Sequence, residues 1–209
     1  MVNSISRCRP YFELLSKSIQ SMPFEDVDRV ASLLVEAYEK ERSIFLFGNG
    51  GSAALASHFA CDLGKGAANG SNKRFRVMAL TDNVPLMTAW ANDSKYEDIF
   101  AEQLANFARP GDIAFAISGS GNSLNVLEAL RAAKAIGSTT VGLGGFAGGL
   151  MRALCDLCIV VPCDNMQIIE DLHLCVAHSL FTCVRSKISH PGLATRAIGP
   201  RLVSRTGTQ

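Results

Sequence analysis

Two pairs of ionisable side chains, far apart in the sequence, have the composition of an active site. His58 and Asp62 are four residues apart, just after a glycine-rich stretch. Glu170 and His178 are eight residues apart, in an apolar segment of the C-terminal part. Each pair offers one imidazole and one carboxylate, the groups that bind divalent metals and transfer protons. The four side chains are therefore candidates for a metal site or an acid–base site.

Helical spacing decides whether the members of each pair can act together. Residues four apart share a helix face, so His58 and Asp62 should be neighbours. Eight residues extend about 12 Å along a helix and about 80° around it, so Glu170 and His178 converge less naturally on one ion. An isolated histidine and aspartate four residues apart on a helix are more often a surface ion pair. His173 lies between Glu170 and His178, and we assign no role to it. Two imidazoles and two carboxylates still form a reasonable four-ligand set for zinc or a similar metal.

Two loops rich in glycine and serine could hold a phosphate. Residues 118–123 (SGSGNS) follow a strand-like run and open a helix-like one. Backbone amides, hydroxyls and a helix N-terminus together favour an anion there. The loop lacks the Walker lysine and the dinucleotide glycine pattern, so a phosphomonoester fits better than a nucleotide. A simple helix cap is the alternative, but residues 48–52 (GNGGS), in an equivalent place, favour a ligand site.

Strand-like and helix-like segments alternate along the chain, and they must position these loops. Two amphipathic helices are expected within about residues 10–41. The expected strands are residues 43–47, 75–80, 113–117, 139–143 and 159–161. The expected helices between and after them are residues 52–63, 84–91, 96–107, 123–136 and 165–186. The alternation predicts an α/β fold with a parallel sheet covered on both faces. Ligands of such sheets bind at the carboxyl ends of the strands, where both polar loops fall.

Composition narrows the class of protein. Of the 209 residues, 48% are hydrophobic and 19% charged, as in ordinary globular domains. The net charge of +1 gives no reason to expect a nucleic-acid or membrane partner. No apolar run approaches a spanning helix, and the first ten residues carry no signal core, so a cytoplasmic protein is expected. Residues 189–209, which contain no acidic residue, are expected to form a flexible tail.

Seven cysteines, an odd number mostly within apolar segments, indicate reduced thiols. Cys155 and Cys158 form a Cys-x-x-Cys pair that stands alone, whereas a zinc ribbon needs a second pair. The pair leads into an apolar run, so core packing is expected in preference to a redox or metal role.

Several segments together resemble the sugar isomerase (SIS) domain, and more narrowly the phosphoheptose isomerase family. They are GNGGS, SHFACDL, TDN, AND, ISGSGNS and IEDLHLCVAH, in the family's order over about residues 10–188. The resemblance implies a three-layer αβα sandwich with a five-stranded, doubly wound parallel sheet of flavodoxin-like topology. It implies one domain over residues 1–188, with N-terminal helices for oligomerisation. It also implies a cytosolic homotetramer with active sites at subunit interfaces, and a divalent metal, zinc in bacterial members.

The resemblance assigns roles to individual residues. The implied metal ligands are His58, Asp62, Glu170 and His178. The implied substrate-binding residues are Asn49, Gly50, Gly51, Ser52, Asp93, Ser118, Gly119, Ser120 and Ser123. Three positions depart from the family pattern. Asp62 stands where the family has a glutamate that is both ligand and base, Glu170 replaces a glutamine ligand, and Gly119 replaces a threonine common in the family.

The implied reaction is the aldose–ketose isomerisation of sedoheptulose 7-phosphate to D-glycero-D-manno-heptose 7-phosphate, through an enediol. Asp62 is the first candidate for the base, with His178 as its acid–base partner. Glu170 is the second candidate for the base, because it has the reach that Asp62 lacks. Three other functions stay open: a non-catalytic SIS scaffold of the replication-initiator-associating type, an isomerase of another sugar phosphate, and, last in order, a sugar-phosphate-sensing regulator.

Overall fold

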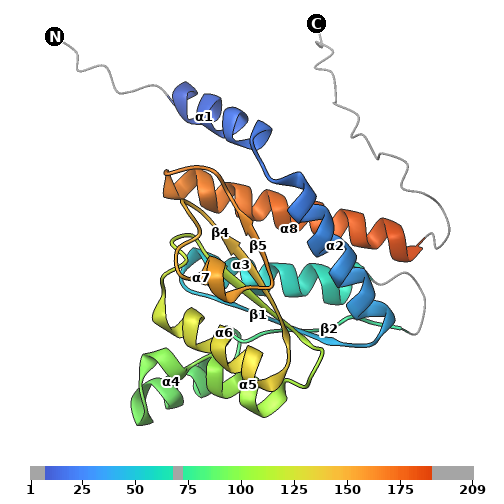
Figure 1. Cartoon of the computed structure of the whole chain (residues 1–209), viewed down its shortest axis with the longest axis vertical. Helices are drawn as coiled ribbons and strands as arrows, with labels where there is room; N and C mark the ends of the chain where they lie inside the picture. The colour runs from blue at the N-terminus through green and yellow to red at the C-terminus, as the bar shows by residue number, and fades with distance from the viewer. Residues whose placement is uncertain (1–7, 68–72, 190–209) are drawn as a thin grey trace, which may run out of the picture.

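A central parallel sheet lies between two layers of helices in the computed structural model, which describes residues 8–67 and 73–189 (Figure 1). The expected tail at residues 189–209 lies outside the described residues, apart from the last residue of the final helix. The elements in chain order are α1 (Arg9–Gln20), α2 (Phe24–Glu39), β1 (Ser43–Gly48), α3 (Gly51–Cys61), the π-helical turn η1 (Asp62–Gly66), β2 (Arg76–Ala79), α4 (Val84–Asp93), the 3-10 turn η2 (Tyr96–Asp98), α5 (Ala101–Phe107), β3 (Ile113–Ser118), α6 (Leu124–Ile136), β4 (Thr139–Gly144), α7 (Met151–Leu154), β5 (Leu157–Val160) and α8 (Met166–Ser189).

The sheet is entirely parallel, with strand order β2-β1-β3-β4-β5. The central strands β1, β3 and β4 are buried on both faces, because helices cover both sides of the sheet. In β1, Ile44 and Leu46 belong to one core cluster, whereas Phe45 and Phe47 belong to another. The first cluster joins the sheet to α2, α3 and α8, and the second joins it to α5, α6 and α7. The predicted three-layer αβα fold with five parallel strands is confirmed.

The strand order creates a topological switch point between β1 and β3. From β1 the chain crosses to β2 on one side, and from β3 it crosses to β4 on the other. The loops that leave the two strands therefore diverge and open a crevice at the carboxyl edge of the sheet. Gly48 ends β1 and Ser118 ends β3, so the two predicted ligand loops flank this crevice.

Three local features differ from the expected elements. The helix expected over residues 52–63 is α-helical only to Cys61, after which residues 62–66 form the π-helical turn. The helix expected over residues 96–107 divides into η2 and α5, and the short α7 was not expected from the sequence. At η1 the physical reason is visible, because Gly64 and Gly66 weaken the α-helix and allow close packing. A Cβ on Gly66 would lie 2.8 Å from Cζ of Phe181 in α8.

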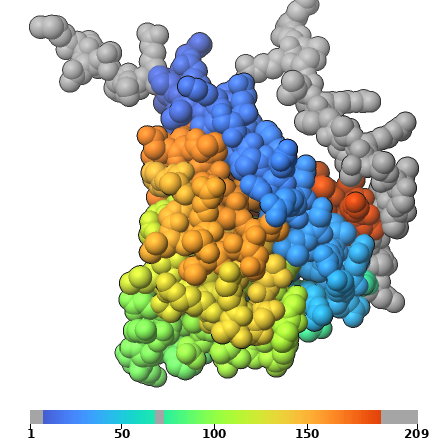
Figure 2. Space-filling model, viewed as in Figure 1, coloured from blue at the N-terminus to red at the C-terminus, as the bar shows by residue number. Residues whose placement is uncertain are grey.

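The N-terminal helix α1 projects along one end of the molecule and contacts α8 (Figures 1 and 2). The Tyr11 hydroxyl donates a hydrogen bond to Oδ2 of Asp171. This contact raises the pKa of Tyr11 to about 12. Among the described residues, no helix is both long enough and apolar enough to cross a bilayer.

Candidate active site

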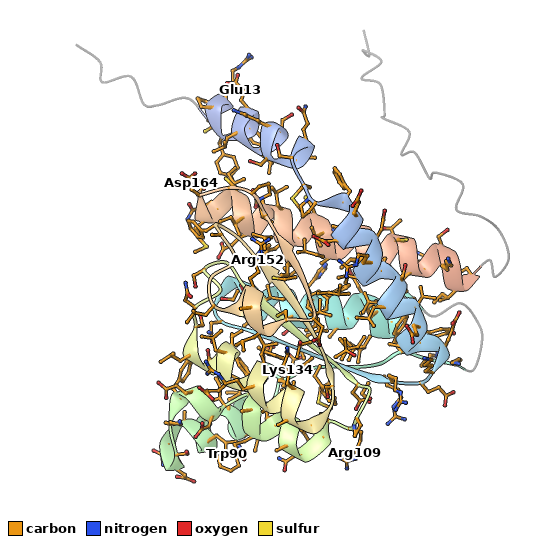
Figure 3. The ribbon with its side chains drawn as sticks, viewed as in Figure 1. Glu13, Trp90, Arg109, Lys134, Arg152 and Asp164 are labelled. Carbon is orange, nitrogen blue, oxygen red and sulfur yellow. The ribbon has the colours of Figure 1, made fainter. Side chains whose placement is uncertain are left out.

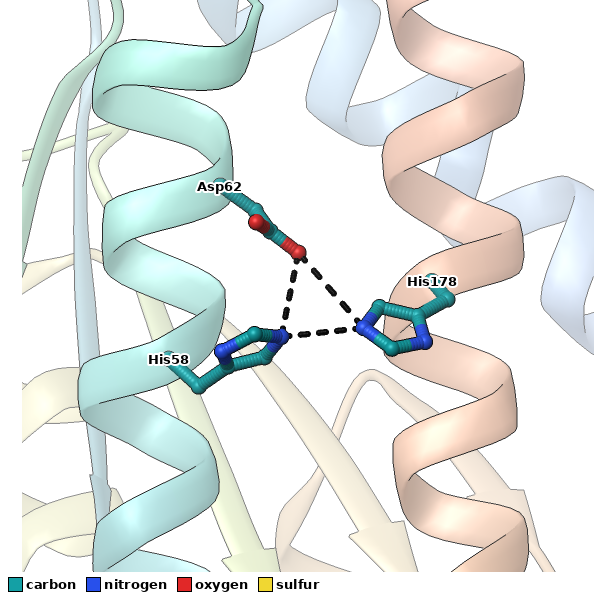
Figure 4. Close-up of side chains that lie close together, drawn as sticks. All are labelled: His58, Asp62 and His178. Atoms are coloured by element: carbon teal, nitrogen blue, oxygen red, sulfur yellow. Dashed lines mark hydrogen bonds and ion pairs between the residues drawn. The ribbon is translucent and has the colours of Figure 1, made fainter.

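Two histidines and one aspartate meet between α3 and α8 (Figure 4). Nε2 of His58 lies 2.9 Å from Nε2 of His178. Oδ2 of Asp62 lies 3.4 Å from Nε2 of His58 and 3.9 Å from Nε2 of His178. The imidazoles are about half exposed, at 48% and 51%, whereas the Asp62 side chain is 23% exposed. We call these three residues the histidine cluster.

The donor atoms of the histidine cluster have the spacing of metal ligands. Tetrahedral zinc ligands about 2.1 Å from the ion lie about 3.4 Å from one another. The three separations observed, 2.9, 3.4 and 3.9 Å, scatter around that value. Two imidazole nitrogens and one carboxylate oxygen are also donors that zinc accepts, and three ligands leave a position open. The residues present therefore fit a divalent metal ion.

The cluster depends on the helical spacing of His58 and Asp62 and on the packing of α8 against α3. His58 and Asp62 are neighbours through the i,i+4 relation, because residue 62 still follows helical backbone angles. The third member, His178, arrives because α8 runs alongside α3. Glycines permit the close approach: Gly51 faces Glu170 near the start of α3, and Gly66 faces Phe181 after its end.

The fourth expected ligand, Glu170, does not join the cluster in this structure. Its Oε1 lies 3.2 Å from the position of a Cβ on Gly51, at the N-terminal end of α3. Eight residues of helix separate it from His178, about 12 Å along the axis, so the two side chains point at different turns of α3. The Glu170 carboxylate instead lies at a helix N-terminus, which favours negative charge.

Glu170 and both histidines of the cluster line one cavity of about 390 Å³. Gly51 and Ser52 of the first ligand loop line it as well, whereas Asp62 does not. A small sugar phosphate is of a size that such pockets accept. The cavity thus places the carboxylates of Glu170 and Asp171 and the imidazoles of the cluster where a bound molecule would contact them.

His173, to which the sequence analysis assigned no role, also lines this cavity but is 1% exposed. Its Nε2 lies 3.0 Å from the carbonyl oxygen of Gly144, at the end of β4. Burial lowers the pKa of His173 to about 4, against the opposing effect of this contact. The imidazole is therefore neutral near pH 7 and ties α8 to the sheet.

The loop at residues 118–123 is shaped by its own side chains. The Ser118 hydroxyl accepts a hydrogen bond from the Gly121 amide at 3.2 Å, and the Ser120 hydroxyl accepts one from the Asn122 amide at 3.3 Å. Ser123 precedes α6, and its side chain makes no capping hydrogen bond. The loop therefore leads into a helix N-terminus that retains donors for an anion.

Two positions of this loop, Gly119 and Gly121, leave no room for a side chain. Gly121 has a φ of +65°, and a Cβ there would lie 2.1 Å from the carbonyl oxygen of Gly148. A Cβ on Gly119 would lie 2.5 Å from Sδ of Met166. The space that a threonine would occupy at position 119 is thus taken by the first residue of α8. The sequence alone could not reveal this contact, because the two residues are far apart in the chain.

The first ligand loop is tied to the second by an amide pair. Nδ2 of Asn49 donates to Oδ1 of Asn125 at 2.9 Å, and Nδ2 of Asn125 donates to Oδ1 of Asn49 at 2.8 Å. The hydroxyl of Tyr96 also donates to Oδ1 of Asn49, at 3.2 Å. Asn49 therefore holds the crevice together, with two partners that no sequence signal indicated. Gly50, with a φ of +55°, makes the turn, and Ser52 is buried in α3.

Asp93 lies apart from the cavity. It ends α4, is exposed, and its Oδ1 accepts a hydrogen bond from Nδ2 of Asn92 at 2.7 Å. A role in substrate binding at this position stays a prediction.

Known proteins share both the sequence and the architecture. The profile of the SIS domain family matches residues 11–145. The chain is 37% identical to a phosphoheptose isomerase of Helicobacter pylori over 178 residues, which cover 85% of this chain and 92% of that protein. The structure of a phosphoheptose isomerase from Neisseria gonorrhoeae matches with a TM-score of 0.79 at 30% identity, covering 86% of this chain and 97% of the other. One from Francisella tularensis matches with a TM-score of 0.83 at 27% identity, covering 89% and 100%.

Proposed function

Since the chain belongs to the SIS domain family and, within it, to the phosphoheptose isomerases, we propose that it isomerises a phosphorylated sugar. The substrate is sedoheptulose 7-phosphate and the product D-glycero-D-manno-heptose 7-phosphate. The observation that carries this proposal is the joining of a glutamate and two histidines in one cavity, beside the two loops of the switch point.

Isomerisation moves a proton between C1 and C2, which requires a base near those carbons and an acid near the carbonyl oxygen. The amides and hydroxyls of residues 118–123 would hold the phosphate, with Ser118, Ser120 and Ser123 as hydroxyl donors. Anchoring the phosphate at one end fixes the reacting carbons at the other. A divalent ion, zinc by its donor set, would be held by His58, Asp62 and His178, and would supply Lewis-acid polarisation of the sugar oxygens.

Asp62 and Glu170 are the two candidates for the base. Asp62 adjoins His178 at 3.9 Å but does not line the cavity. Glu170 lines the cavity and lies outside the histidine cluster. We assign the proton at C1 and C2 to Glu170, with His178 as its acid–base partner, and we assign metal binding to Asp62. Glu170 is exposed and lines the cavity, so its carboxylate can meet a substrate carbon, whereas Asp62 does not line the cavity.

The activity is tested by incubating the purified protein with sedoheptulose 7-phosphate and following the aldose product by NMR. Parallel samples contain added zinc or a chelator. We expect turnover that falls on chelation and returns with a divalent metal. If no divalent metal supports turnover, the non-catalytic scaffold becomes the better description. If another sugar phosphate is turned over faster, the reaction class holds and the heptose assignment is wrong.

We further propose that the chain acts in the cytoplasm as a homotetramer, with active sites where subunits meet. Residues 118–123, which we call the phosphate loop, have exposed apolar side chains nearby that support an interface. Leu124 is 57% exposed and Leu150 is 61% exposed. A second apolar surface lies on the N-terminal helices, where Phe12 is 63% exposed and Phe24 is 58% exposed. Exposed apolar side chains grouped in this way are typical of surfaces that associate.

A further inference from the structure

A pair of cysteines lies behind the phosphate loop and plays no part in the proposed reaction. Cys155 follows α7, and Cys158 lies in β5, directly opposite Gly142 of β4. Both side chains pack against the core yet remain partly exposed. The sequence predicts core packing for this pair, and the packing is present, but it does not close the thiols off from solvent.

The two sulfur atoms lie close to the same point beside Gly142 of β4. A Cβ on Gly142 would lie 2.8 Å from Sγ of Cys155 and 3.0 Å from Sγ of Cys158. The absence of a side chain at Gly142 is thus what allows both sulfurs to converge over β4. Because both sulfurs lie within 3.0 Å of that one point, a short movement of the side chains would bring them to the bonding distance of a disulfide, about 2.05 Å.

The backbone between the two cysteines is held in a fixed bend. Nitrogen and Oγ1 of Thr140 each donate to Oδ2 of Asp156 at 2.8 Å. The Asp156 amide donates back to the carbonyl oxygen of Thr140 at 3.0 Å. Lys134 lies 3.5 Å from the other carboxylate oxygen of Asp156. This network fixes Asp156, one of the two residues between the cysteines, so the proximity of the thiols does not depend on a mobile loop.

The electrostatic surroundings make one thiol the better nucleophile. Hydrogen bonding from Cys155 lowers the pKa of Cys158, with a smaller contribution from the positive charge of Arg152, against the effect of burial. Arg152 comes from α7, beside the sheet (Figure 3). The same hydrogen bond and burial raise the pKa of Cys155. Since the thiolate is the reactive form, Cys158 would attack first and Cys155 would resolve the product.

The cysteine pair is joined to the phosphate loop through α7. The Cys155 amide donates to the carbonyl oxygen of Met151 at 3.1 Å, and the Met151 amide donates to the carbonyl oxygen of Gly121 at 2.9 Å. The neighbouring Leu150 amide donates to Oδ1 of Asn122 at 3.0 Å. A movement of Cys155 towards Cys158 would therefore pull on two hydrogen bonds that shape the loop.

We propose that Cys155 and Cys158 are a redox-active dithiol whose oxidation to a disulfide loosens the phosphate loop. The oxidant is a small disulfide, such as oxidised glutathione. The Cys158 thiolate attacks one of its sulfurs and releases one thiolate. Cys155, losing its proton to solvent, then attacks the Cys158 sulfur of the mixed disulfide and releases the second thiolate. Two electrons pass from the two cysteines to the small disulfide, which becomes two thiols.

The disulfide is tested on the full chain by equilibration with oxidised glutathione, alkylation and intact mass measurement. We expect two of the seven thiols to become protected from alkylation, and a reductant to restore them. Cys155→Ser and Cys158→Ser should each abolish the internal disulfide, and Cys155→Ser should instead retain a glutathione adduct. Cys163→Ser, which removes another partly buried cysteine, should still form it. Seven free thiols in the oxidised wild type, or protection of two that persists in Cys155→Ser, would overturn the proposal.

The link to the loop is tested by hydrogen exchange of the reduced and oxidised forms. Its regulatory meaning rests on the proposed function, but this measurement does not. We expect the amides of Leu150 and Met151 to exchange at least about tenfold faster in the oxidised wild type, and to be unaffected by oxidant in Cys155→Ser. Unchanged exchange in a protein that carries the disulfide would overturn the link. A protein without isomerase activity that passes both tests would contradict only the proposed function.

Discussion

At the scale of single residues, the site is defined by which side chains reach one another. Asp62 is shorter by one methylene than the glutamate of the family pattern, yet its carboxylate contacts both histidines of the cluster. The glutamate at position 170 supplies a second carboxylate in the cavity itself. Under the proposed function, the departures at positions 62 and 170 separate two roles, since Asp62 binds the metal and Glu170 transfers the proton.

Removal of the Asp62 charge should weaken metal binding specifically. Asp62→Asn keeps the shape of the side chain but not the anion, and loss of a ligand charge should lower zinc affinity by at least about 10-fold to 100-fold. Competition with a chromogenic chelator measures this directly. Asp28→Asn, on the exposed face of α2, is the control and should bind zinc as the wild type does. Equal affinity of Asp62→Asn and wild type would remove Asp62 from the ligand set.

His173 should make the fold sensitive to acid. Its pKa is about 4 in the folded chain, below the ordinary value of 6.5, so the unfolded chain binds a proton that the folded chain does not. The resulting stability is fully present above pH 6.5 and is lost as the pH falls towards 4, by up to about 3 kcal/mol. Denaturant unfolding of wild type and His173→Gln at several pH values checks this. The variant should show a shallower decline; parallel curves would contradict the assignment.

At the scale of elements, the fold and parts of the site follow from the sequence for different reasons. The strands are predictable because a parallel sheet buries both faces and gives unbroken apolar runs such as residues 113–117. The contact of His58 with Asp62 is predictable because it is local. Three other features could not be predicted, because they depend on how α8 and α6 pack. They are the contact of His178 with His58, the position of Glu170 outside the cluster, and the hydrogen bonds between Asn49 and Asn125.

The glycines of the two ligand loops should differ in their tolerance of a side chain. Gly121→Ala combines a positive φ with a contact of 2.1 Å to the backbone of residue 148, whereas Gly50→Ala has a positive φ and open space. The second change should cost about 1–3 kcal/mol of stability from backbone strain alone, because φ +55° with ψ −121° is a conformation that favours glycine. The first should cost at least about 2 kcal/mol more, because a backbone carbonyl cannot turn aside. Denaturant unfolding compares them, and equal losses would show that the loop can shift freely.

At the scale of the whole molecule, the exposed apolar surfaces bear on assembly. The helices α1 and α2 carry Phe12 and Phe24 on their outer surfaces. Burying such side chains between subunits would stabilise an oligomer by roughly 1.5–3 kcal/mol for each side chain fully buried.

Charges placed on the N-terminal helices should break the assembly. Sedimentation of the wild type is expected to give about 89 kDa, four times the 22.3 kDa chain. The double variant Phe12→Asp with Phe24→Asp should give a smaller species with an unchanged far-UV spectrum. Phe107→Asp changes an exposed phenylalanine on α5, in the opposite layer, and should leave the mass unchanged. A wild type that sediments as a monomer would contradict the proposed tetramer.

The central claim is that the cavity between α3 and α8 moves a proton between C1 and C2 of a sugar phosphate. Turnover of sedoheptulose 7-phosphate in D₂O, followed by proton NMR, tests it most directly. The account predicts deuterium at C2 of the aldose product, because a base exchanges its proton with solvent. It also predicts that Glu170→Gln loses this exchange by about 10²-fold or more, while its zinc affinity stays close to that of the wild type. Full activity in both Glu170→Gln and Asp62→Asn, or product without deuterium, would contradict it.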